Sequence, residues 1–168
     1  MNKSSPLTKD ETMSSERFVY VTYIATTADR VWQALIDGEI TRQYWAGYEN
    51  HSDWREGSSW QHRSPDAAHT VRVMGKVIEI RPPHRLILTW AEPDKADDLS
   101  QHSRVTFDIE SMDHAVRLTV THDQFAVGSD MPGRISKGWP RVLSSLKSLL
   151  ETGTVLDVWS GPSSCGTK

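Results

Sequence analysis

The sequence predicts a single α+β domain in which a curved, seven-stranded antiparallel sheet wraps around one long C-terminal helix. Three observations lead to this fold class. The middle of the chain alternates apolar and polar side chains with the period of half-buried strands. From Trp139 onward the apolar residues recur at steps of three, four, seven, ten and eleven, which is the stripe of an amphipathic helix. Two short stretches after the first strand also show helical spacing.

The composition is that of a globular protein with many large aromatic side chains. The chain has 168 residues, of which 37% are hydrophobic and 24% charged, and it contains seven Trp. This length and composition suit one domain. We expect it to span residues 17–159, with a flexible leader over 1–16 and a flexible tail over 160–168, because both ends are poor in apolar side chains.

Charge and cysteine usage exclude several classes of partner. The net charge of −3, without a run of Lys or Arg, gives no field that would attract nucleic acid. No apolar segment is long enough for a signal peptide or for membrane insertion. The only cysteine is Cys165, so an intramolecular disulfide is impossible and we expect a cytoplasmic protein.

The first strand and the two short helices come from the N-terminal part of the chain. Residues 17–25 are rich in β-branched and aromatic side chains, which favours a strand with apolar character on both faces. Residues 26–29 then offer a hydroxyl N-cap with an acid in the first turn, and a helix is expected up to about Gly38. Residues 39–46 predict a second, shorter helix that ends near Trp45.

Three hairpins are expected to make up the rest of the sheet. They join residues 49–54 to 58–63, residues 70–81 to 85–92, and residues 104–110 to 116–121. In the first connection Gly57 can supply a positive φ. In the second, Pro82 and Pro83 interrupt the ladder because proline has no N–H to donate.

The closing helix is expected after a loop over residues 124–132. Gly133 leads into this helix, and Gly153 is placed to end it at the C′ position. Pro140 should either begin its regular part or bend it. Residues 93–101, which are acidic and polar, are expected to form a second surface loop.

This order of elements is the helix-grip arrangement, and three local motifs narrow it further. They are Ala-Asp-Arg-Val-Trp-Gln-Ala-Leu at 28–35, Gly-Lys-Val-Ile-Glu-Ile-Arg-Pro-Pro-His-Arg-Leu at 75–86, and Gly138-Trp139 with the Leu-rich helix after it. Together they resemble the activator of heat-shock-protein-90 ATPase homologue-like family of the SRPBCC (START-like) superfamily. The resemblance implies a deep, mostly apolar cavity between sheet and C-terminal helix that holds a lipid-like or aromatic molecule, and a link to stress response.

One departure from that family bears on partners. The eukaryotic co-chaperone for which the family is named has a separate N-terminal domain that engages the chaperone. This sequence has a sixteen-residue polar leader in its place. Stimulation of a chaperone ATPase is therefore not the leading expectation, and a homodimer is left open.

A set of large apolar side chains, together with one histidine, is expected to line the cavity. Its members are Trp45, Trp54, Trp60, Trp90, His122, Trp139, Leu143 and Leu146. Aromatic rings are suited to this because each covers a large area. The alternative for any one of them is simple packing in the core.

His122 is the one residue of this set that could act as a catalyst. The alternation of Val116, Leu118 and Val120 places it on the apolar face of its strand. There it could bind a ligand or act as a general base. The alternative is a histidine at the edge of the core that is satisfied by a backbone carbonyl.

The remaining polar side chains point to no further chemistry. Arg72, Lys76, Arg117, Asp108 and Glu110 face solvent by their parity, so no carboxylate pair is expected for acid–base work. No His-x-x-x-His pair, Cys-x-x-Cys pair or glycine-rich phosphate loop is present, so neither a metal nor a cofactor is expected.

The leading hypothesis is thus a non-enzymatic protein that sequesters or senses a small hydrophobic or aromatic molecule. Two alternatives stay open. One is a polyketide-cyclase-like enzyme that uses His122 in the cavity, and the other is a co-activator of a chaperone ATPase.

Overall fold

The computed structural model describes residues 13–160 and confirms the predicted α+β helix-grip fold. Its main elements are β1 (Phe18–Ile24), α2 (Ala28–Ile36), α3 (Gly38–Tyr44), β2 (Glu49–Ser52), β3 (Ser59–Arg63), β4 (Val71–Arg81), β5 (Arg85–Trp90), β6 (Ser103–Ser111), β7 (Val116–Asp123) and α4 (Met131–Thr152). Two 3₁₀ turns, η1 (Pro93–Lys95) and η2 (Leu99–Gln101), lie in the segment that was predicted to be a loop.

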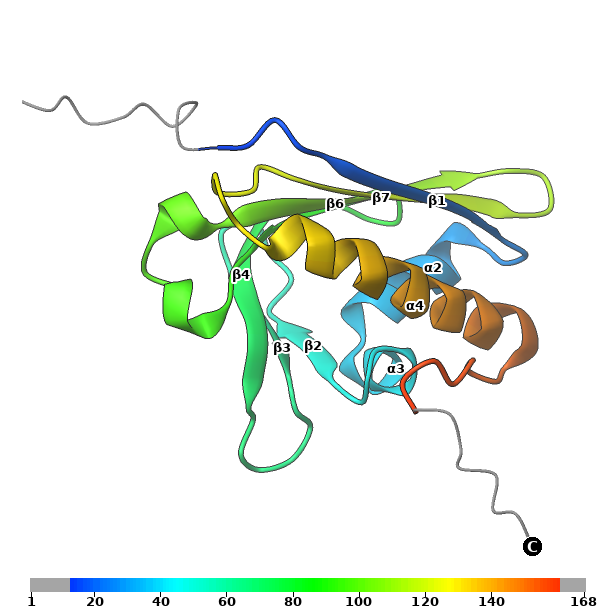
Figure 1. Cartoon of the computed structure of the whole chain (residues 1–168). Coiled ribbons are helices and arrows are strands. Elements are labelled where there is room, and N and C mark those ends of the chain that lie inside the picture. The colour runs from blue at the N-terminus through cyan, green and yellow to red at the C-terminus, as the bar shows by residue number, and fades with distance from the viewer. Residues whose placement is uncertain (1–12, 161–168) are drawn as a thin grey trace, which may run out of the picture.

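The sheet is a meander that β1 completes from the other side. Its seven strands lie in the order β1-β7-β6-β5-β4-β3-β2, and every neighbouring pair is antiparallel. The sheet bends strongly, so that β1, β7 and β6 run across the direction of β3 and β4 (Figure 1). The long helix α4 lies inside this bend, where the sheet covers its apolar side.

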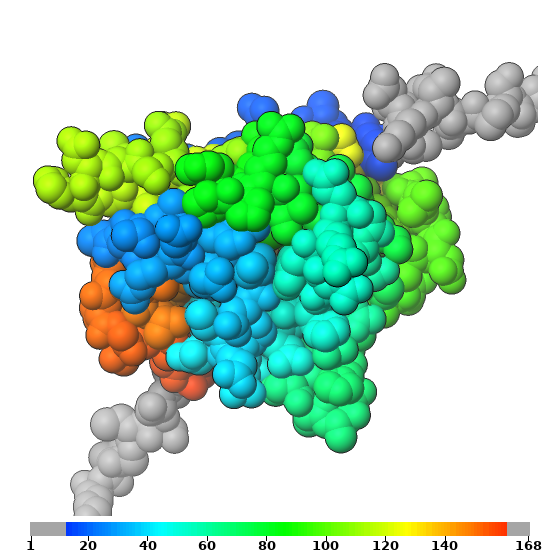
Figure 2. All heavy atoms as spheres, turned by 180° about the vertical axis from the view of Figure 1, so that it is seen from behind, coloured from blue at the N-terminus to red at the C-terminus, as the bar shows by residue number. Residues whose placement is uncertain are grey.

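Helices α2 and α3 close the side of the domain that the sheet leaves open. The Thr27 hydroxyl caps α2 by accepting a hydrogen bond from the Arg30 amide at 3.4 Å, as its sequence predicts. The Asp37 carboxylate caps α3 in the same way, through the Glu39 amide at 2.8 Å. From the opposite side of the molecule, α2 and α3 fill the space between the C-terminal end of α4 and strands β2 and β3 (Figure 2).

The closing helix begins earlier than its sequence indicates, and this corrects the predicted loop over 124–132. It starts at Met131, and Pro132 lies in its first turn. Proline is tolerated there because its missing N–H would have no partner within the helix. Pro140 lies inside the helix and does not begin it. Gly153 has φ of 77° and donates its amide to the Leu149 carbonyl at 2.8 Å, so the predicted C′ glycine is confirmed.

The first predicted hairpin is shorter than its sequence indicates. Strand β2 ends at Ser52, and Trp54 has φ of 51°, which is outside the range of a strand. The Ser52 hydroxyl accepts the Trp54 amide at 3.0 Å and so ends the ladder. Gly57 has φ of 83°, as predicted for the connection.

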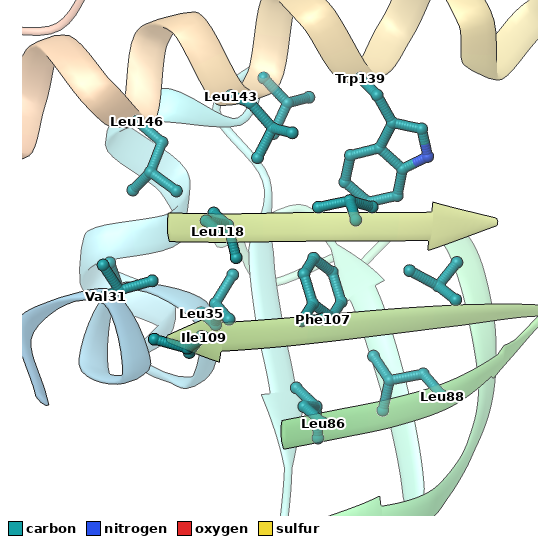
Figure 3. Packing of buried hydrophobic residues seen from close by; sticks show 14 of the residues in the cluster. Val31, Leu35, Leu86, Leu88, Phe107, Ile109, Leu118, Trp139, Leu143 and Leu146 are labelled. Carbon is teal, nitrogen blue, oxygen red and sulfur yellow. The ribbon is translucent and has the colours of Figure 1, made fainter. Parts of the chain in front are cut away.

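The core lies between α4, the concave face of the sheet and α2. Figure 3 shows Trp139, Leu143 and Leu146 of α4 above Leu118 of β7, with side chains of the neighbouring strands and of α2 below. Leu118 and Leu146 are completely buried. Burial of apolar surface contributes about 25 cal/mol of stabilising free energy per Å² removed from water, and this contribution holds the helix on the sheet.

The two ends of the described chain contact the domain. The Ser14 amide donates to the Phe125 carbonyl at 2.7 Å, and Met13 forms an isolated bridge with Ala126. Residues 1–12 and 161–168, which include most of the predicted leader and tail and also Cys165, lie outside the described residues. Within residues 13–160, no helix combines the length and the apolar character needed to cross a membrane.

Candidate functional site

The main candidate site is an open groove beside the N-terminal half of α4. Two adjoining hollows of about 600 Å³ and 220 Å³ share four lining residues, and we call their union the Trp45 groove. The shared residues are Trp45, Val73, Arg134 and Trp159. The larger hollow extends toward Tyr48, His62 and Arg72, and the smaller one toward Trp90, Gly138 and Trp139.

The wall of the groove belongs to a cluster of aromatic rings drawn from four parts of the chain. Trp45 stacks on Trp90 with ring centroids 6.2 Å apart and meets the edge of Trp139 at 5.3 Å. Trp90 in turn lies 5.6 Å from Trp139 and 5.4 Å from Trp60. Such offset and edge-on pairs are the arrangements that aromatic quadrupoles favour, so the rings of this apolar wall stabilise one another.

His122 lies behind this wall, in a chain of hydrogen bonds. The Trp139 indole Nε1 donates to His122 Nδ1 at 3.2 Å, and an indole N–H can only donate. The proton of His122 is therefore on Nε2, which donates to the Ser103 hydroxyl at 2.8 Å. That hydroxyl in turn donates to the Trp90 carbonyl at 3.2 Å.

This environment keeps His122 neutral and occupied. Burial lowers its pKa to about 3, although the nearby Asp123 carboxylate acts in the opposite direction. Both ring nitrogens have partners, and the side chain is completely buried. The geometry thus resembles the alternative given for His122, a histidine of the core whose hydrogen bonds are satisfied. Its partners are a hydroxyl and an indole in place of a backbone carbonyl.

A second buried histidine, His62, lies in the lining of the groove itself. Its Nδ1 is 2.9 Å from Asn50 Oδ1, and the Asn50 amide nitrogen donates to the Leu35 carbonyl at 3.0 Å. Because Asn50 must then present its oxygen to the ring, Nδ1 of His62 carries the proton and Nε2 is an acceptor. The pKa of His62 is lowered to about 3, first by burial and then by the charge of Arg72.

Charged side chains form the rim of the groove. Arg134 of α4 contacts Glu92 at 2.6 Å, and Lys95 contacts the other oxygen of the same carboxylate at 3.1 Å. These bonds lower the pKa of Glu92. Arg72 is exposed, as predicted, and its guanidinium lies 4.8 Å from the centre of the Tyr48 ring.

One more aromatic side chain of the groove wall, Trp159, comes from the segment that follows α4. After α4 the chain turns back alongside α3 (Figure 1), and the Trp159 indole donates to the Tyr44 carbonyl at 3.3 Å. This bond holds the ring over the groove, although 39% of Trp159 stays exposed. The segment therefore contributes a wall that is anchored at one point and partly open to solvent.

The residues predicted for the site separate into three groups. Trp45, Trp90 and Trp139 line the groove. Trp60 and His122 contact the same aromatic cluster from behind and are fully buried.

The third group lies elsewhere. Leu143 and Leu146 are one and two turns further along α4, in the closed part of the core. Trp54 is partly buried against the core near the β2–β3 connection. The groove therefore lies beside the N-terminal half of α4, whereas the cavity was expected under the whole helix.

Several lining residues were not singled out in the sequence, namely Tyr48, His62, Val73, Arg134 and Trp159. Strand parity could have indicated His62, because Trp60 and His62 share one face of β3 and both are buried. No local signal distinguishes Arg134 or Trp159, since their positions depend on where α4 and the segment after it lie.

Two other hollows lack this combination of features. One, of about 360 Å³, is lined by α2, α3 and the C-terminal end of α4, and the other, of about 510 Å³, by residues 25–29 and 111–116 together with Pro83. Neither lining contains a Trp, Tyr or Phe side chain. In the described part of the chain, no cluster of three or more His, Cys, Asp or Glu side chains has the arrangement of a metal site.

Comparison with solved structures confirms the class of fold. The Aha1 dimer from Colwellia psychrerythraea is similar over 82% of this chain and 98% of its own, with a TM-score of 0.68 and 18% identity. An HSP90 activator from Plasmodium falciparum is similar over 80% and 95%, with a TM-score of 0.66 and 17% identity. CalU16 from Micromonospora echinospora covers 82% of this chain and 77% of its own, with a TM-score of 0.64 and 19% identity. These similarities, all below 25% identity, show that the chain has the helix-grip fold.

The family follows from the sequence model that matches the chain. The model for activator of Hsp90 ATPase homologue 1-like proteins matches residues 25–151. The chain therefore belongs to this family, as its three motifs indicated. A comparison with curated protein sequences gave no significant match.

Proposed function

We propose that the protein binds a small hydrophobic or aromatic molecule in the Trp45 groove. The observation that carries this proposal is the aromatic wall of Trp45, Trp90 and Trp139, which faces an open hollow between sheet and helix. Ligand sites are usually concave and mostly apolar, with a few polar groups that orient the ligand. His62 and the arginines of the rim supply such groups.

The size of the groove limits the affinity. A ligand that buries about 300 Å² of apolar surface gains roughly 7 kcal/mol at about 25 cal/mol per Å², before the costs of ordering are subtracted. This corresponds to micromolar binding at best. Reversible binding of this strength suits sensing or transient storage.

Filling the groove should weaken ligand binding without harm to the fold. Gly138 lies in the lining of the groove, and a Cβ built on it meets no atom within 4 Å. In Gly138→Leu we expect the dissociation constant of 2-methoxynaphthalene, measured by equilibrium dialysis, to rise at least about tenfold, which equals about 1.4 kcal/mol. The helix itself should gain, because leucine has a higher helix propensity than glycine.

The matched control is Gly133→Leu on the same helix. Gly133 also has open space around its Cβ position, but it is not among the residues of the groove. This variant should bind the probe like the parent protein. Equal affinity in all three proteins would show that the probe binds elsewhere, and no binding to the parent protein would reject the proposed function for this ligand class.

The family match favours co-activation of a chaperone as a second candidate. One structural neighbour is itself described as an HSP90 activator. If this candidate is right, the purified protein raises the rate of ATP hydrolysis by Hsp90 in a dose-dependent manner. An unchanged rate at saturating protein, with a known activator as positive control, would reject it.

The geometry gives little support to the enzymatic alternative with His122. A general base needs a free lone pair within reach of the substrate. The lone pair of His122 Nδ1 already accepts the Trp139 indole N–H, and His122 lies behind the aromatic wall.

A further inference from the structure

A polar relay, formed by the Leu35 carbonyl, Asn50 and His62, gives the Trp45 groove one hydrogen-bond acceptor. The Leu35 carbonyl fixes the orientation of the Asn50 amide, and Asn50 Oδ1 fixes the tautomer of His62. The Asn50 backbone amide is also held, by the Thr41 hydroxyl at 2.9 Å. Nε2 of His62 is thereby left as the acceptor end of the relay, and it has no hydrogen-bond partner among residues 13–160.

The surroundings of His62 define where a ligand atom would lie. Only 5% of His62 is exposed, and the residue forms part of the lining of the larger hollow. Its centroid is 4.7 Å from that of Trp45 and 5.5 Å from that of Tyr48. A planar ligand that lies against Trp45 therefore brings its edge close to His62.

We infer that the groove selects aromatic ligands that carry a hydroxyl or N–H donor, and that this donor binds Nε2 of His62. The inference rests on the proposed function and adds the chemical class of the ligand. An acceptor that the bound ligand covers discriminates in favour of a ligand with a donor, because a ligand without one shields the acceptor from water and leaves it unpaired. The low pKa of His62 is consistent with this role, since a protonated ring would offer no acceptor.

Charge at the rim agrees with a neutral donor group. The lining of the larger hollow contains two arginines and two carboxylates, at Arg72, Arg134, Glu92 and Asp94, so its formal charges cancel. Arg134 is already paired with Glu92 at 2.6 Å. A phenol or an indole N–H fits this balance better than a fully charged group.

The test compares two probes, 2-naphthol and its methyl ether 2-methoxynaphthalene, in which a methyl group replaces the donor hydrogen. In the parent protein we expect 2-naphthol to bind about fivefold to tenfold more tightly, the effect of one buried hydrogen bond. In His62→Phe the preference should fall to about one, and 2-methoxynaphthalene should bind at least as tightly as to the parent protein, because no acceptor is left unpaired. His51→Phe, an exposed histidine on β2, should keep the full preference.

The outcomes separate this inference from the function on which it rests. Equal binding of both probes to the parent protein overturns the inference and leaves the proposed function standing. A preference that persists in His62→Phe also overturns it, because another group must then accept the donor. Failure of both probes to bind overturns both.

A second measurement covers the case in which His62→Phe does not fold. In ¹⁵N-labelled parent protein, the Nε2 resonance of His62 should have the shift of an unprotonated imidazole nitrogen. Addition of 2-naphthol should move this resonance, and addition of 2-methoxynaphthalene should not. A protonated Nε2 in the free protein would contradict the inference directly.

Discussion

Replacement of Trp139 with alanine is expected to lower the free energy of unfolding by about 3–5 kcal/mol, the usual cost of removing a large buried aromatic side chain. The indole is 97% buried, with 3% exposed, and its ring meets Trp45, Trp90 and Phe107. Its loss would also remove the N–H that His122 Nδ1 accepts. Urea unfolding at pH 7 measures the effect.

Two further variants separate the contributions of Trp139. Trp139→Phe keeps most of the apolar contact but leaves His122 Nδ1 without its donor, at a cost of about 1–3 kcal/mol. Trp159→Ala makes the same change of side chain at a partly exposed position and should cost much less. Similar losses for Trp139→Ala and Trp159→Ala would contradict the expectation that burial of the indole sets the cost of its removal.

Mild acid should destabilise the fold through its two buried histidines. Both His62 and His122 have a folded pKa of about 3, against 6.5 for the unperturbed side chain. Between these values the unfolded chain binds a proton that the folded chain does not, so stability falls as the pH falls from about 6.5 toward 3. From pH 7 to pH 5 each histidine should cost about 2 kcal/mol, or on the order of 4 kcal/mol for the pair.

The window between pH 7 and pH 5 isolates the histidines from the carboxylates. Glu92 and Glu151 have lowered pKa values, so their contribution to stability is present above the usual glutamate pKa of 4.5 and is lost only as the pH falls below it. Urea unfolding at pH 7, 6 and 5 measures the slope, and His62→Phe should reduce it by about half. A free energy of unfolding that stays constant over this window would contradict the burial of the two rings.

The same burial bears on the choice between binding and catalysis. His122 was the residue through which an enzymatic function would act, and its nitrogens are occupied by Trp139 and Ser103. His62, by contrast, has one nitrogen directed to Asn50 and lies in the lining of the groove. The two histidines are similarly buried and have similar pKa values, but only His62 also lines the groove.

Local patterns were sufficient for most of the fold. Alternation predicted the strands, helical spacing predicted α2 and α4, and the hydroxyl cap and Gly153 marked helix ends correctly. These features depend on residues within a few positions of one another, so sequence order alone carries the information. Where local signals compete, the prediction was wrong, as at the beginning of α4, where Pro132 was placed in a loop.

The sequence by itself was also sufficient to name three of the tryptophans that line the Trp45 groove, Trp45, Trp90 and Trp139. Only the tertiary structure decided where the hollow lies and what it presents to a ligand. Trp159 reaches Tyr44 across 115 positions of the chain, and His62 reaches Leu35 through Asn50. Contacts of this kind arise when distant segments pack together, because the bend of the sheet and the placement of α4 set the distances, and no local period encodes them.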